Sequence, residues 1–118
     1  MKKATKKILL ILGVPSHLLG YRYLGDAIET TIEDRTKLQG ITKILYPEVA
    51  KRNGTTWTRV ERAIRHAIEH SFNNLTPGVI AEIYGNSLDA MRGKPTNSQF
   101  IATIAELYGD EIRESEEI

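Results

Sequence analysis

The sequence has no cysteine, and only four prolines and two phenylalanines among its 118 residues. Without cysteine the chain cannot form disulfides, use a thiolate in catalysis or hold zinc through sulfur. Runs of β-branched residues are scarce, whereas Ala, Leu, Ile, Glu and basic residues are common, which favours helices. No apolar stretch is long enough to cross a bilayer. We therefore expect an all-α protein with a cytoplasmic location and no contact with a membrane.

A secretory signal is also missing, although the N-terminal segment imitates one. Four lysines between positions 2 and 7 precede the apolar run Ile8–Leu12. Gly13 and Pro15 end this run, and no small-residue cleavage site follows. We expect the segment to form the first helix of a folded domain.

The net charge of +1 conceals a separation of charge along the chain. Between Thr42 and Asn74, basic residues outnumber acidic ones six to three, whereas from Glu106 to the end acidic residues outnumber basic ones six to one. A basic segment of this kind can meet phosphate groups. We expect a single domain over residues 1–118, with a basic centre and a flexible acidic tail at about 109–118.

Glycine, proline and asparagine divide the chain into consecutive short helices. The expected helices run over Ala4–Leu12, Ser16–Asp34, Gly40 onward, Pro47–Arg52, Thr58–Phe72, Val79–Tyr84 and Ser98–Leu107. We expect Ser16 to cap the second helix, with Leu19 on its apolar face and Gly20 weakening it. Leu107 should point inward at the end of the last helix.

Three residues in the basic segment have the spacing of a helix-turn-helix. Ala50, Gly54 and Val60 are separated by three and five residues. A small residue lets two helices cross closely, glycine permits the sharp turn, and an apolar residue on the second helix fixes the crossing angle. Other helical hairpins use Ala and Gly in the same way, so the spacing is moderately specific.

The helix after this turn has one apolar face and one basic face. Its apolar positions follow helical spacing: Val60, Ala63, Ile64, Ala67, Ile68, Ser71 and Phe72. At about 100° per residue, Arg62 lies nearly opposite this face. Around it lie Thr58, Arg65, His66 and Glu69. Because the planar fork of arginine bonds guanine O6 and N7 together and also clamps phosphate, this face is typical of a DNA-recognition helix.

Several features of this helix have alternative interpretations. Its arginines could pair with Glu61 and Glu69 on a solvated face. Glu61 could close a capping box with Thr58, or accept a hydrogen bond from cytosine N4. Trp57, the only tryptophan, is expected to pack in the turn as a buried staple.

The segment from His66 to His70 also matches an inverted zinc-peptidase motif, with Glu69 as the base. His17 is the one remaining histidine, and the chain is too short to add a domain that would form a substrate cleft. We therefore predict that the histidines are exposed or contact phosphate, that the chain is not an enzyme, and that it holds no metal or cofactor.

Longer runs of the sequence resemble one known family. They are Gly13–Pro15, Gly20–Leu24, Gly40–Lys43, Leu45–Pro47, Arg59–Glu69, Lys94–Ser98 and Phe100–Ala102. In this order, from about Ile8 to Leu107, they resemble the C-terminal DNA-binding effector domain of the stage-zero sporulation response regulator of endospore-forming bacteria. Trp57 and His70 depart from it, since the family has a small and an apolar residue there. The resemblance implies a compact six-helix bundle that contains one helix-turn-helix.

The resemblance also implies sequence-specific binding to double-stranded DNA and regulation of transcription in sporulation. The expected target is a box similar to TGTCGAA, bound by a tandem homodimer, with RNA polymerase contacted through the region matching Asn73–Asn86. The residues assigned to DNA are Arg59, Glu61 and Arg62 toward bases, Arg65 and His66 toward the backbone, and Thr58 and Lys51 beside them. No receiver domain is expected within these residues. The alternative is a helical protein-interaction module that uses the same exposed helix.

Overall fold

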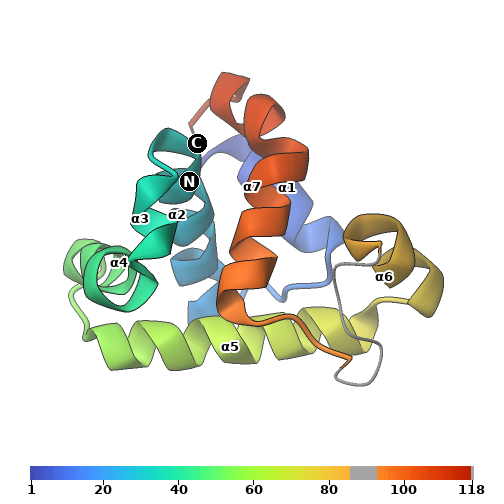
Figure 1. Cartoon of the computed structure of the whole chain (residues 1–118), viewed down its shortest axis with the longest axis horizontal. Helices are drawn as coiled ribbons and strands as arrows, with labels where there is room; N and C mark the ends of the chain where they lie inside the picture. Colours follow the sequence, from blue (N-terminus) through green and yellow to red (C-terminus); the bar gives the residue numbers. More distant parts are fainter. Residues whose placement is uncertain (86–92, 118) are drawn as a thin grey trace.

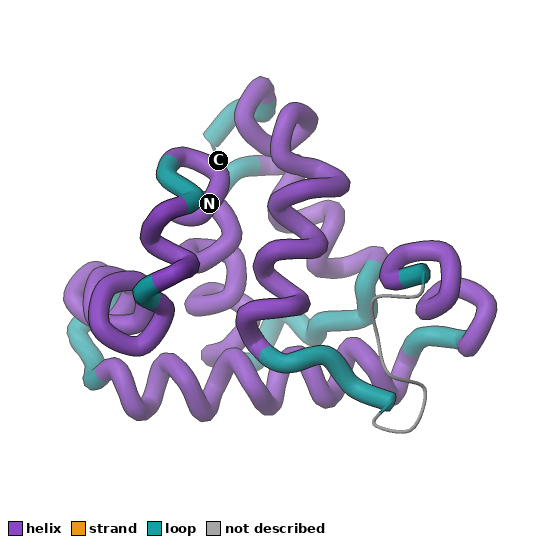
Figure 2. The backbone as a smooth tube through the Cα atoms, in the orientation of Figure 1, coloured by secondary structure: helices purple, strands orange, loops and turns teal. Residues whose placement is uncertain are grey.

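The structure is a computed structural model that describes residues 1–85 and 93–117, and these residues form a bundle of helices (Figure 1 and Figure 2). The elements are α1 (Lys3–Ile11), α2 (Leu19–Glu33), α3 (Thr36–Gln39), the π-helical segment η1 (Ile41–Leu45), α4 (Tyr46–Arg52), α5 (Trp57–Asn74), α6 (Pro77–Tyr84) and α7 (Asn97–Glu114). The expected all-α fold is confirmed. The expected count of six is wrong, because the described residues form seven α-helices besides η1.

The additional helix lies between α2 and α4. The Asp34 carboxylate, which lies just before α3, accepts hydrogen bonds from the hydroxyl and the backbone N–H of Thr36 at 2.6 and 3.0 Å, and these bonds lower the pKa of Asp34. After Gly40, the Leu45 N–H bonds to the Gly40 carbonyl at 3.2 Å in the wider turn of η1. Pro47 stands in the first turn of α4, where its missing N–H breaks no hydrogen bond. The predicted helix from Pro47 to Arg52 is confirmed and starts one residue earlier, at Tyr46.

Helix α2 is central to the bundle and packs against both α5 and α7. Figure 1 shows α5 along the lower edge of the molecule, with α2 and α7 rising from it. The side chains of Leu24, Ala27 and Ile28 on α2 are fully buried. Gly20 lies so close to α5 that a Cβ atom there would stand 2.1 Å from the Ala63 carbonyl oxygen. Gly20 therefore permits a backbone contact that no other residue allows.

The start of α2 differs from the expectation. Ser16 is not the cap, because α2 begins after Leu18, which provides no side-chain cap. A turn closed by the Leu18 N–H and the Pro15 carbonyl, at 3.2 Å, precedes it. Leu19, expected on the apolar face, is 68% exposed. As the first residue of α2 it lies at the edge of α5 and outside the core.

The end of α7 also differs from the expectation. The predicted end at Leu107 is wrong, because the helix continues to Glu114 and buries Ile112. Residues 109–114, which we assigned to a flexible acidic tail, are helical. Leu107 does not point inward but is 52% exposed. The burial of Ile112 explains the extra turns, since it adds a core contact beyond the predicted boundary.

The two ends of the described chain lie side by side, at the pole of the molecule away from α5 (Figure 1). The Lys3 N–H donates to the Glu116 carbonyl at 2.8 Å, and the Ala4 N–H donates to the Ser115 hydroxyl at 2.8 Å. These bonds join the start of α1 to the segment that follows α7.

Helix α6 begins at Pro77, where the Thr76 hydroxyl accepts a hydrogen bond from the Val79 N–H at 3.3 Å. The predicted short helix over Val79–Tyr84 is thus confirmed and starts slightly earlier. Asn86, the last residue of the segment that resembles a polymerase-contacting region, lies outside the described residues. In the described part of the chain, no helix is both long and apolar enough to span a membrane.

Candidate nucleic-acid interface

A tight turn at Asn53 and Gly54 joins α4 to α5. Helix α4 ends at Arg52 with Asn53 as its C-cap, and Gly54 adopts a left-handed conformation with φ of +63°. The Thr55 N–H returns to the Ala50 carbonyl at 3.0 Å, the hydrogen bond of a Schellman C-cap. The Asn53 amide also donates to the Asp26 carboxylate at 2.8 Å, which fastens the turn to α2. The predicted stop at Asn53 and Gly54 is confirmed.

One face of α5 is buried against the rest of the bundle. Its buried residues are Val60, Ile64, Ala67, Ile68 and Ser71. Ala50 on α4 is 4% exposed, so the small residue and Val60 meet in the core on either side of the turn. The Ser71 hydroxyl donates to the Leu12 carbonyl at 2.6 Å. The predicted apolar face is confirmed, with Ala63 and Phe72 partly buried at its edges.

The candidate DNA-binding residues lie on the opposite side of α5. Those exposed on α5 are Thr58, Arg59, Arg62, Arg65 and His66. At about 100° per residue they fall within about 60° of Arg62, so they form one surface. Glu61 is half-buried at its edge, and Lys51 is exposed on α4. We call the five exposed residues on α5 the basic ridge.

The arginines of this surface differ in their ion pairs. Arg65 pairs with Glu61 one helical turn earlier, as the solvated-face interpretation predicted. Among the described residues, Arg59 and Arg62 make no ion pair. Two guanidinium groups of the basic ridge are therefore free to bind an anionic or hydrogen-bonding partner.

The start of α5 bears on one of the two interpretations of Glu61, the capping box. Thr56 is the N-cap, and its hydroxyl accepts a hydrogen bond from the Arg59 N–H at 3.3 Å. The capping-box interpretation of Thr58 and Glu61 is excluded, because Thr58 is the second residue of α5 and not its N-cap. The Glu61 carboxylate instead pairs with Arg65, on the edge of the exposed surface.

Trp57 does not form the buried staple that we expected. It is the first residue of α5, and its side chain is 44% exposed. The tryptophan is therefore partly open to solvent at the start of α5.

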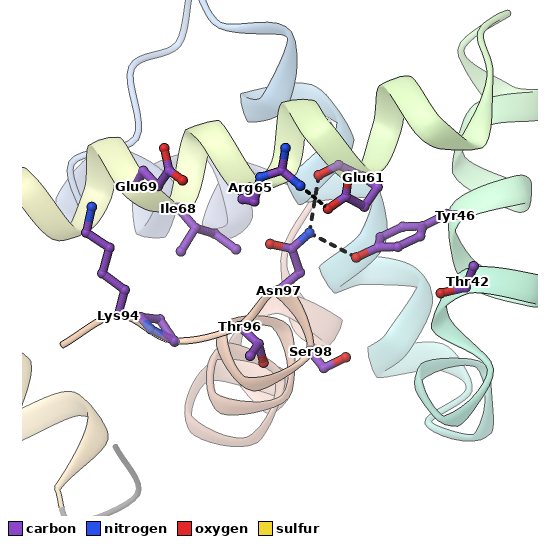
Figure 3. A pocket seen from close by; sticks show the side chains of 11 residues that line it. Thr42, Tyr46, Glu61, Arg65, Ile68, Glu69, Lys94, Thr96, Asn97 and Ser98 are labelled. Atoms are coloured by element: carbon purple, nitrogen blue, oxygen red, sulfur yellow. Dashed lines mark hydrogen bonds and ion pairs between the residues drawn. The ribbon is translucent and has the colours of Figure 1, made fainter. Parts of the chain in front are cut away.

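Two hollows flank the basic ridge. The first, of about 370 Å³, lies between α2 and α5 and is lined by Leu19, Tyr23, Thr55, Arg59, Arg62, Ala63 and His66. The second, of about 450 Å³, lies between α5 and the start of α7 (Figure 3). We call them the α2–α5 hollow and the α5–α7 hollow. The contributions of α2, η1 and α7 to these hollows were not predictable from the sequence, because these segments lie far from α5 in the chain.

The α5–α7 hollow contains charges of both signs. Figure 3 shows Arg65, Glu61 and Glu69 along α5 on one side and Lys94 on the other. The Asn97 amide donates to the Tyr46 hydroxyl at 2.9 Å and to the Glu61 backbone carbonyl at 3.2 Å. Burial raises the pKa of Tyr46, although the bond from Asn97 opposes this effect. These bonds hold α4, α5 and α7 together at the floor of the hollow.

The inverted zinc-peptidase motif forms no metal centre among the described residues. His66 and His70 are exposed, and Glu69 is half-buried. Within residues 1–85 and 93–117, no group of three His, Cys, Asp or Glu side chains is placed to hold a metal ion. Of the two histidines on α5, His66 belongs to the basic ridge and His70 lies outside it.

One comparison with known families gives a match over most of the chain. The family model described as "Sporulation initiation factor Spo0A C terminal" matches residues 5–107, which include the whole of α2, α4 and α5.

Proposed function

The chain belongs to the family of sporulation initiation factor Spo0A C-terminal domains, and we propose that it binds a specific sequence of duplex DNA. Domains of this family are DNA-binding effector domains of response regulators and not enzymes. The observation that carries this proposal is the unpaired state of Arg59 and Arg62 on the basic ridge, within the described residues. Arginine in an exposed helix of this kind reads guanine through two parallel hydrogen bonds.

We propose that α4 and α5 act as a helix-turn-helix, with α5 as the recognition helix. Ala50, Gly54 and Val60 support this assignment through the close crossing and the left-handed turn. In such a unit the second helix enters the major groove and its N-terminal residues reach the base edges. Arg59 and Arg62 lie in the N-terminal half of α5 and meet this condition.

The remaining candidates have distinct proposed roles. The Glu61 carboxylate accepts a hydrogen bond from the exposed amino group of a cytosine once the Arg65 side chain leaves Glu61 and contacts a phosphate. Arg65 and His66, one turn further along α5, contact the backbone. Thr58 beside them and Lys51 on α4 complete the interface.

Two wider functions follow from the family. We propose that the chain regulates transcription by binding a TGTCGAA-like box, as a tandem homodimer on repeated boxes. We also propose that RNA polymerase contacts the region around α6, where Val79 is 37% exposed on the described surface. Both proposals depend on the first, because each partner meets the chain on DNA.

A binding titration tests the proposed function. We expect a duplex with one TGTCGAA box to bind more tightly than a scrambled duplex, by at least about 100-fold near physiological salt. Affinity for both should fall steeply as salt rises, because bound phosphates release counterions. Equal and negligible retention of both duplexes at low salt would contradict DNA binding. It would leave a protein-interaction module as the better account.

A further inference from the structure

The two hollows beside the basic ridge differ in charge. In the described structure, no carboxylate lines the α2–α5 hollow, whereas Arg59, Arg62 and His66 do. Glu61 and Glu69 line the α5–α7 hollow and offset its two cations. A polyanion placed along α5 is therefore attracted more strongly to the side of α2.

The wall of the α2–α5 hollow that faces these cations is apolar. Leu19, the first residue of α2, lines it with 68% of its surface exposed. Tyr23, one turn later, is 7% exposed and closes the floor. The contact of Gly20 with the Ala63 carbonyl holds this end of α2 against α5, so Leu19 has a fixed place beside the ridge.

We propose that the α2–α5 hollow binds the sugar–phosphate backbone of one DNA strand, with Leu19 packed against a deoxyribose and His66 beside an adjoining phosphate. This inference rests on the proposed function. When Arg62 points to the floor of the major groove, the flank of α5 that carries His66 faces the backbone of one of the two DNA strands that border the groove. A sugar with its phosphate presents the pairing of apolar and anionic groups that this hollow matches. Helix α2 thereby becomes a further DNA-binding element beside α4 and α5.

The chain offers a matched control for Leu19. Leu10 on α1 is also 68% exposed, and it does not line the hollow. Substitutions of the two leucines therefore change the same chemical group at the same exposure. Thermal unfolding of all variants establishes first that each is folded.

The experiment measures affinities for a short duplex with one TGTCGAA box and for a scrambled duplex at several salt concentrations. Leu19→Ala should weaken both by about three- to tenfold, because the lost contact is apolar and independent of sequence, and it should leave the salt slope unchanged. Leu19→Lys should steepen the salt slope by about 0.9, since it adds one phosphate contact. Leu10→Ala and Leu10→Lys should match the unsubstituted chain.

Three results would overturn the inference, and they are distinct. If the Leu19 variants behave as the Leu10 variants while the unsubstituted chain prefers its box, the hollow does not bind DNA and the proposed function stands. If Leu19→Ala weakens binding only on a duplex with two boxes, Leu19 contacts a second copy of the chain. If the unsubstituted chain binds neither duplex, the proposed function fails together with this inference.

Discussion

Helices α5 and α7 are both 18 residues long, both begin with a threonine N-cap and both pack against α2, yet their exposed faces carry opposite charge. The ridge of α5 is basic, whereas the exposed acidic residues of α7 are Glu106, Asp110, Glu111 and Glu114. The buried faces serve the same purpose in both helices. The comparison teaches that in this bundle the core determines where a helix lies, and its solvent face determines which partner it can bind.

The largest expected effect tests how each helix approaches α2. Gly20→Ala should destabilise the fold by about 3 kcal/mol or more, because the new Cβ would lie 2.1 Å from a backbone oxygen of α5 that cannot move aside. Gly109→Ala on α7 is the control, since its Cβ would meet Ile32 at an ordinary 3.9 Å. Gly109→Ala should stabilise by up to about 1 kcal/mol. Chemical denaturation measures both, and equal effects would show that the two contacts are alike.

The second effect separates the recognition of bases from the electrostatic attraction to phosphate within the basic ridge. Arg62→Ala should lower affinity for the matched box by about 1–3 kcal/mol and leave single-mismatch boxes closer in affinity, because a contact with two base atoms is lost. Arg65→Ala should weaken all duplexes similarly and reduce the salt slope by about one. Titrations at several salt concentrations measure these quantities. If Arg65→Ala erased the preference while Arg62→Ala left it intact, the two roles would be reversed.

The third effect compares the helix starts. The Thr96 hydroxyl accepts from the Gln99 N–H at 3.1 Å, and the Gln99 side chain accepts from the Thr96 N–H at 2.8 Å, so α7 has a complete capping box. Thr56→Ala removes a longer bond from the Arg59 N–H, at 3.3 Å, and an exposed hydrogen bond with the Thr58 hydroxyl at 3.2 Å. We expect Thr96→Ala to destabilise by about 1 kcal/mol and Thr56→Ala by about 0.5 kcal/mol. The reverse order in thermal unfolding would show that the capping box does not make the start of α7 the stronger of the two.

The smallest effect concerns the acidic face of α7. Glu111→Gln should change stability by less than about 0.5 kcal/mol, since the side chain is exposed. At physiological salt its affinity for DNA should stay within about twofold of the unsubstituted chain, because charges beyond a Debye length of about 8 Å are screened. A large gain in affinity would place α7 close to the DNA and break the comparison with α5.

The parts of the fold that local sequence determines were predictable. The buried face of α5 follows from helical spacing alone, and the stop at Gly54 follows from the left-handed conformation that glycine adopts readily. Pro47 likewise lies in the first turn of α4, the part of a helix where its missing N–H breaks no hydrogen bond. The basic ridge was predictable for the same reason, because a helix with one buried face has only one exposed side.

The parts that depend on distant contacts were not predictable. Leu19 has the sequence context of a core residue, and its exposure depends on where α5 crosses α2. The extension of α7 past Leu107 depends on the core place of Ile112. The α5–α7 hollow needs Asn97 beside Tyr46, residues that lie 51 positions apart. No local pattern contains this information.

The adjacent ends of the chain have a mechanical consequence. A tether on either end enters the molecule at the same pole, where the Lys3 N–H meets the Glu116 carbonyl, and α5 lies at the other pole (Figure 1). Tension applied between the two ends would act first on this hydrogen bond between Lys3 and Glu116. The helix that carries Arg59 and Arg62 would stay outside the line of force, and its outer face would remain open to a bulky neighbour joined at either end.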